Sequence, residues 1–251
     1  MAVEITHTED KIYFKFENVN KLGFTDYDKK LFEKIRAVKW TVSNGRYIYS
    51  SKLKMSLHQI VMAHWYGEEA LTESKKAGYI VEHHNNIGFD CQISNLSFAP
   101  EPQNKQKAFG YDKERLTMLE NIAINFYKDF ETGRYQITIG FNKPYFIVNP
   151  KQNTAIDVAV IFLIYNDDFY RTMTDATNIL HELKEYGKLE FSNLRNVGFH
   201  YKEAIHIPAD APENQVFFVD DDGRIAVRLG TPHLIINQIG ENKDLYKEKD
   251  S

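Results

Sequence analysis

The stretch Tyr79–Lys107, YIVEHHNNIGFDCQISNLSFAPEPQNKQK, holds the residue types best suited to metal binding and acid–base chemistry. Glu82 and His83 are neighbours, Asn95 follows His83 by twelve positions, and Asn104 follows Asn95 by nine. Hydrolytic chemistry needs an activated water and neutralisation of the charge that develops on the substrate. Carboxylate and amide oxygens suit a hard divalent cation, and an imidazole titrates near neutral pH. These residue types therefore suit a site that holds a divalent cation beside a general base.

Each of these residues has an expected role. Glu82 and the amide oxygen of Asn104 would bind Mg²⁺ (or Mn²⁺), leaving room in its coordination shell for phosphate and water. His83 would act as general base, and Asn95 would fix the orientation of its ring through the other ring nitrogen. His84 is the alternative base, but the spacing to Asn95 and the preceding carboxylate favour His83.

The same residues resemble the ββα-metal site of the HNH endonucleases, especially the phage and intron-encoded homing type. The preceding segments, Asp26–Ser50 and Ser56–Tyr66, are similar to the usual lead-in of that family, with a Lys-Trp hairpin and a helix carrying Leu-His. The resemblance covers about residues 20–108. It implies a nuclease that cuts or nicks double-stranded DNA, encoded by a bacteriophage or bacterial mobile element, with the residues above in the same roles.

Two positions depart from the family pattern. The usual carboxylate is Asp, whereas this chain has Glu82, which is one methylene longer and makes reduced activity or another metal preference plausible. Cys91 stands where the family loop often has a polar residue, and the sequence gives it no role.

Local patterns predict the elements that would position these residues. Lys39–Ser50 predicts a hairpin around Asn44-Gly45, and a helix is expected to begin after Ser56 and to end at Gly67. On that helix His58 and His64 lie six residues apart, which favours packing over a metal pair. Around the site, the expectation is a strand over residues 78–82, a polar loop over 83–90, a strand over 93–98 and a helix from 100 to about 108.

The second half has weaker signals. A long helix is expected over Tyr111–Phe130 and another over Asp167–Tyr186, stopped by Gly187. Tyr135–Phe141 and Lys143–Val148 read as paired strands, and Ala155–Tyr165 as a buried helix or strand. Short strands are expected over residues 188–191, 204–207, 216–219, 224–229 and 233–237. Asp220-Asp221-Asp222-Gly223 reads as a hairpin turn rather than a calcium loop.

Composition excludes several classes of protein. The 251 residues are 43% hydrophobic and 26% charged, which is typical of globular domains. A single cysteine, Cys91, excludes a disulfide framework and a zinc site of four cysteines. The N-terminus resembles neither a signal nor a transit peptide, and the longest apolar run is too short to cross a bilayer. We therefore expect no membrane partner and a cytoplasmic location, in a bacterial cell or a phage-infected host.

Charge leaves nucleic-acid binding open. The net charge is −4, with +2 over residues 1–110 and −6 over the rest. A local basic surface can still bind DNA, because screening confines fields to about 10 Å. One active site per chain would nick DNA, and a homodimer could cut both strands. The expected phosphate contacts are Arg46, Lys52, Lys54, Lys105 and Lys107.

The sequence thus predicts an α+β protein, with an N-terminal ββα-metal HNH nuclease domain over residues 1–110 and a second α+β domain of undecided role over 111–251. One alternative is a binding protein that keeps the HNH scaffold with little or no catalysis, as a regulator or inhibitor of a host defence system. Another is a defence or restriction nuclease with the same chemistry.

Overall fold

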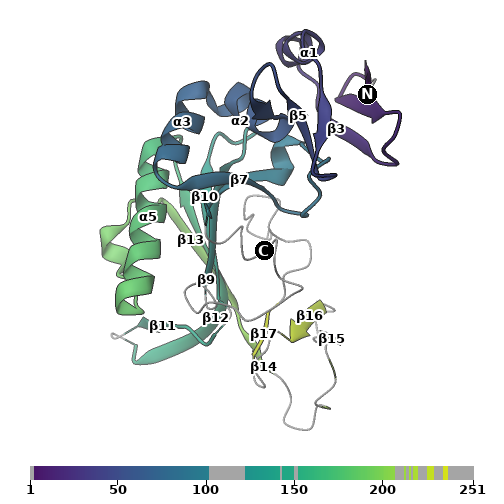
Figure 1. Ribbon diagram of the computed structural model, residues 1–251. Helices are drawn as coiled ribbons and strands as arrows, with labels where there is room; N and C mark the ends of the chain where they lie inside the picture. Colours follow the sequence, from purple (N-terminus) through teal and green to yellow (C-terminus); the bar gives the residue numbers. More distant parts are fainter. Residues whose placement is uncertain are drawn as a thin grey trace. The chain divides into compact units, whose positions relative to one another are not determined.

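The computed structural model describes residues 3–101, 122–141, 143–149 and 152–206, with short strands beyond (Figure 1). The chain forms two compact units, Met1–Glu101 and Pro102–Ser251. The class is α+β, as predicted. Gly110, the expected boundary, lies outside the described residues. No helix in the described ranges is long and apolar enough to cross a bilayer.

The first unit opens with an antiparallel meander that supports the rest of the unit. One face of β2 is buried through Ile12, Phe14 and Phe16. The ring of Phe14 contacts Trp40 edge-on with centroids 5.6 Å apart, and the indole of Trp40 donates to the carbonyl of Ile35 in α1. The meander and first helix are β1 (Val3–His7), β2 (Lys11–Phe16), β3 (Leu22–Asp26) and α1 (Lys29–Arg36).

The predicted hairpin and capped helix are confirmed. Asn44 and Gly45 both have positive φ, 52° and 66°, as a type I′ turn requires. The backbone N–H of Ser56 donates to the side chain of Gln59 at the start of the next helix, and Gly67 (φ 94°) ends it. These elements are β4 (Thr41–Ser43), β5 (Tyr47–Ser50), β6 (Met55–Ser56), α2 (Leu57–Tyr66) and α3 (Glu68–Lys76).

The expected strand–loop–strand follows and packs below α2 and α3 (Figure 1). Strand β7 (Tyr79–His83) pairs antiparallel with β8 (Leu96–Pro100). The predicted second strand begins later than expected, because residues Ile93–Asn95 form a 3₁₀ turn, η1. A helix was expected to open within residues 100–102. Pro100 still belongs to β8, Glu101 is helical, and the remainder from 102 lies outside the described residues.

The second unit is built on an antiparallel sheet. Strand β10 pairs with β9 and β12, whereas β11 and β13 pair with β12 alone. Helix α5 lies along β9 and β10, where Phe169 contacts the rings of Phe126 and Tyr135 (Figure 1). These elements are β9 (Ile122–Lys128), β10 (Tyr135–Phe141), β11 (Phe146–Asn149), β12 (Thr154–Tyr165), α5 (Phe169–Tyr186), the 3₁₀ turn η2 (Phe191–Asn193) and β13 (Gly198–Glu203).

Several expectations for this unit are wrong. The end of the helix predicted over 111–130 is strand β9, whose residues alternate between buried and more exposed positions and hydrogen-bond to β10. Strands β10 and β11 pair with successive parts of β12 rather than with each other. No strand forms over 188–191, and β13 was not predicted.

The remaining predictions for the second unit hold. The segment Ala155–Tyr165 lies within a strand, α5 ends at Gly187 in a left-handed conformation, and β15 and β16 form the expected hairpin. The turn between them, residues 220–224, lies outside the described residues. The last small sheet contains β14 (Ile205–His206), β15 (Phe217–Val219), β16 (Ile225–Arg228) and β17 (Leu234–Ile236).

Candidate functional site

Glu82 and His83 occupy the last two positions of β7 and are both buried. In the β7–β8 ladder Glu82 lies opposite Ser97, and His83 lies opposite Leu96. Because consecutive side chains of a strand project to opposite faces, the carboxylate and the imidazole lie on opposite faces of the hairpin. The two residues are therefore adjacent in sequence, but their side chains do not share one face of the hairpin.

The loop between the strands is held by a closed set of amide contacts. The side chain of Asn95 donates to the Oδ1 atom of Asn85 (3.0 Å) and to the carbonyl of Asp90 (2.8 Å), and its own Oδ1 accepts from the backbone N–H of Asn85 (3.2 Å). Asn85 in turn donates to the Asp90 carboxylate (2.7 Å). Asn95 thus fixes the loop. The sequence predicted that its side chain would orient the His83 ring, but the side chain hydrogen-bonds to Asn85 and Asp90 instead. His84, the alternative base, donates its backbone N–H to the Asn95 carbonyl (2.9 Å).

Three other side chains surround His83. The ring of Tyr47 stacks on it with centroids 6.0 Å apart, and the ring of His58 meets it edge-on at 4.9 Å. The Sγ atom of Cys91 lies 3.8 Å from Nε2 of His83. His58 packs against the hairpin as expected, and its buried Nδ1 has no hydrogen-bond partner among the described residues. The sequence did not identify Tyr47 or Cys91, because neither has a spacing that marks it.

Burial keeps both imidazoles neutral. It lowers the pKa of His83 to about 4. Burial, followed by the nearby His83 and Lys75, lowers the pKa of His58 to about 3. Charged imidazolium is poorly solvated in this interior, which is the physical cause of both shifts. At neutral pH His83 therefore carries a free nitrogen electron pair, the form that a general base requires.

The other face of the hairpin offers oxygen atoms. Glu82 is 5% exposed, and the hydroxyl of Ser97 opposite it is buried without a hydrogen-bond partner in the described part of the chain. A carboxylate and a hydroxyl are donors that Mg²⁺ or Mn²⁺ accepts, so the donor types fit such an ion. Asn104, the second expected ligand, lies outside the described residues. Within the described ranges, no three His, Cys, Asp or Glu side chains are grouped to hold a metal.

One expected phosphate contact lies beside the site loop. A Cβ on Gly88 would lie 2.2 Å from the carbonyl oxygen of Arg46, so the loop packs directly on the β4–β5 turn, where Arg46 is exposed. Lys52 and Lys54 are exposed between β5 and β6. Lys105 and Lys107 lie outside the described residues.

Comparison of the chain with protein-family models, with curated proteins and with solved structures gives no match.

Proposed function

We propose that the protein is a metal-dependent endonuclease that hydrolyses phosphodiester bonds of double-stranded DNA. The arrangement that carries the proposal is the buried His83, whose pKa is lowered by burial to about 4, directly after the buried carboxylate of Glu82. Both residues lie at the start of a loop held by Asn85 and Asn95. The resemblance of this stretch to the HNH pattern supports the same assignment. It implies that a bacteriophage or mobile element encodes the protein and that the protein acts in the bacterial cytoplasm.

In this proposal the residues divide the work. Glu82, with Asn104, would hold Mg²⁺ or Mn²⁺, which when bound supplies charge neutralisation for the phosphate and the leaving oxygen. His83 accepts a proton from the attacking water through its unprotonated ring nitrogen. Arg46, beside the loop, contacts a DNA phosphate and so orients the duplex. With one such site in the part of each chain that the structure describes, a monomer nicks DNA and a homodimer can cut both strands.

Glu82 and His83 lie on opposite faces of the β7–β8 hairpin, and this favours a second candidate function. A ring that is 6% exposed and covered by Tyr47, His58 and Cys91 is poorly placed to reach a water held on the Glu82 face. In this second candidate the hairpin serves as a binding scaffold without catalysis, in a regulator or inhibitor of a defence system.

Cleavage of DNA separates the two candidates. Purified protein is incubated with supercoiled plasmid and with phage or bacterial genomic DNA in Mg²⁺, Mn²⁺ or EDTA, beside the His83→Ala and Glu82→Gln variants. The matched control is His64→Ala, because His64 lies on the same helix as His58 but pairs with Asp28 (3.1 Å).

If the protein is a nuclease, we expect nicked or linear product. Its formation should require metal, Glu82 and His83, but not His64. His83→Ala should still bind DNA within a few-fold in a fluorescence anisotropy titration, because the base does not anchor a phosphate. Cleavage by His83→Ala at the parent rate would exclude His83 as the base. DNA binding without product on any substrate would instead support the scaffold.

A further inference from the structure

The backbone of Cys91 is hydrogen-bonded to β3 on both its N–H and its carbonyl. Its N–H donates to the carbonyl of Phe24 (2.9 Å), and its carbonyl accepts from the hydroxyl of Thr25 (2.8 Å). Thr25 and Cys91 are both completely buried. The position of the thiol is therefore set by a strand far away in the sequence, not by the loop alone.

The sulfur contacts two polar groups at nearly equal distances. It lies 3.7 Å from the carbonyl oxygen of Gly88 and 3.8 Å from Nε2 of His83. A carbonyl oxygen can only accept, so the single thiol proton is the donor for Gly88. The sulfur then remains as an acceptor for His83. If the thiol donated to His83 instead, the Gly88 carbonyl would have no donor among the described residues.

We propose that Cys91 is a positioning residue that holds His83 in the tautomer with the proton on Nε2, by accepting a hydrogen bond from Nε2–H. The free electron pair then lies on Nδ1. Nδ1 has no hydrogen-bond partner in the described ranges and is not among their buried unpaired atoms, so it keeps part of the small exposed area of His83, which is 6% exposed. Burial, together with the charge of Asp90, raises the pKa of Cys91, which keeps the thiol protonated for Gly88.

The catalytic meaning of this contact rests on the proposed function, but the tautomer does not. A long-range ¹H–¹⁵N correlation spectrum of the uniformly ¹⁵N-labelled full chain at pH 7.5 distinguishes protonated from unprotonated ring nitrogens. The His83 signals are assigned by their loss in His83→Gln. The expected spectrum of the parent protein has protonated Nε2 and unprotonated Nδ1 at His83. Protonated Nδ1 would overturn the proposal, whatever the variants do.

Two substitutions at position 91 test the cause. Cys91→Ser keeps a group that donates and accepts and should keep the Nε2–H tautomer, whereas Cys91→Ala should give a mixture. An unchanged His83 spectrum in a folded Cys91→Ala protein would overturn the role of the sulfur. Where DNA cleavage is detected, Cys91→Ala should lower kcat about tenfold with little change in KM, and Cys91→Ser should restore it. Because the spectra need no substrate, they decide this proposal even if the parent protein cuts no DNA.

Discussion

His83 shows how strongly burial can change the chemistry of one residue. In water its imidazole would be partly charged near pH 6.5, whereas beside Tyr47, His58 and Cys91 its pKa falls to about 4. Desolvation therefore maintains the neutral form that suits a general base. When the pH falls, protonating the buried ring costs free energy that an exposed ring would not lose. Acid should destabilise this cluster because the unfolded chain binds protons that the folded cluster excludes.

The first unit should lose stability as the pH falls below about 6.5. The folded pKa values of His83 and His58 are about 4 and about 3, so at lower pH the unfolded state binds more protons and is favoured. Above pH 6.5 both states are neutral and the effect is absent. Between pH 6.5 and pH values below 4, the pKa shift of His83 alone lowers the free energy of unfolding by roughly 3 kcal/mol. Urea unfolding from pH 7.5 to 4.5 measures the loss.

The variant His58→Gln removes one of the two groups and should flatten this pH dependence, with His181→Gln on α5 as the control for the substitution itself. Equal pH slopes for the parent and His58→Gln would show that His58 takes up its proton equally in both states.

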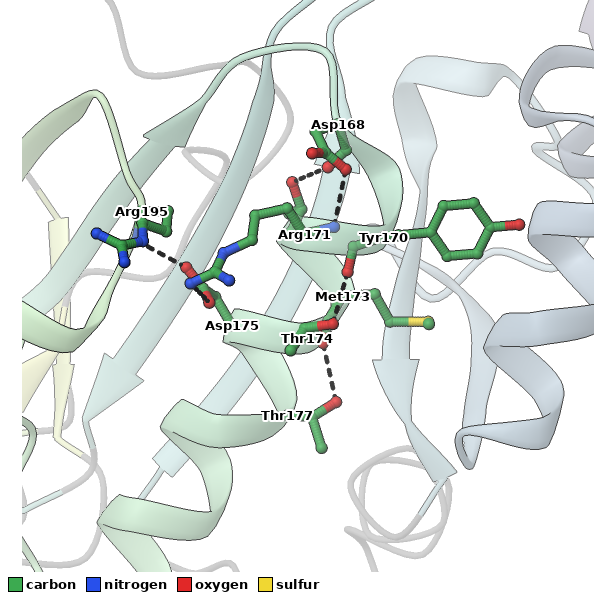
Figure 2. A network of polar contacts seen from close by, with 9 residues as sticks. Asp168, Tyr170, Arg171, Met173, Thr174, Asp175, Thr177 and Arg195 are labelled. Carbon is green, nitrogen blue, oxygen red and sulfur yellow. Dashed lines mark hydrogen bonds and ion pairs between the residues drawn. The ribbon is translucent and has the colours of Figure 1, made fainter.

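At the scale of elements, caps and pairing partners determine where the chain changes structure. Asp168 precedes α5 and its carboxylate accepts from the N–H of Arg171 (2.9 Å), while Gly187 ends the helix at φ 66°. Further along, the buried carboxylate of Asp175 accepts from the backbone N–H of Arg195 (2.9 Å) and pairs with Arg171 (3.0 Å), which ties the segment before β13 to the helix (Figure 2). The helix therefore positions a segment that has no regular structure of its own.

The cap at Asp168 can be tested separately from this network. Asp168→Ala should lower the free energy of unfolding by about 1 kcal/mol, because it leaves an N–H of the first turn without its acceptor. Asp168→Ser can accept the same hydrogen bond and should recover most of the loss. Chemical denaturation followed by far-UV circular dichroism gives both values. A serine variant as unstable as the alanine variant would mean that the charge, not the cap, is responsible.

At the scale of the whole molecule, both units contain buried apolar side chains. The sequence contains two tryptophans, Trp40 and Trp65, and both belong to the first unit. Tryptophan fluorescence therefore reports on the first unit, whereas far-UV circular dichroism reports on both. This difference allows each unit to be followed in the intact chain.

Substitutions in different units should affect the two signals differently. Gly88→Ala would place a Cβ 2.2 Å from the Arg46 carbonyl oxygen and should destabilise the first unit by about 1–3 kcal/mol, shifting the fluorescence midpoint. Asp175→Ala removes a buried carboxylate that accepts from the N–H of Arg195 and pairs with the partly exposed Arg171. It should destabilise the second unit by about 1–3 kcal/mol, shifting only the circular dichroism.

Gly140→Ala is the control, because its Cβ would meet only ordinary contacts at 4.0 Å. A fluorescence midpoint that moves with Asp175→Ala would mean that the units unfold together.

The sequence by itself determined those features that depend on neighbouring residues. Asn44-Gly45 specified a turn with two positive φ angles, Gly67 and Gly187 ended helices, and the polar loop after His83 followed directly from its composition. The α+β class followed from the mixture of such signals. Local stereochemistry operates over a few residues, so it can be read from the chain alone.

Only the tertiary structure decided which groups meet. Strand β9 was predicted as helix because its hydrogen-bond partners lie in β10, and Ala155–Tyr165 was ambiguous until three other strands paired with it. In the candidate site, the side chain of Asn95 hydrogen-bonds within the loop. Cys91, which is hydrogen-bonded to β3, lies beside the His83 ring. These contacts join residues that are distant along the chain, and their geometry and burial arise only when the sheets pack.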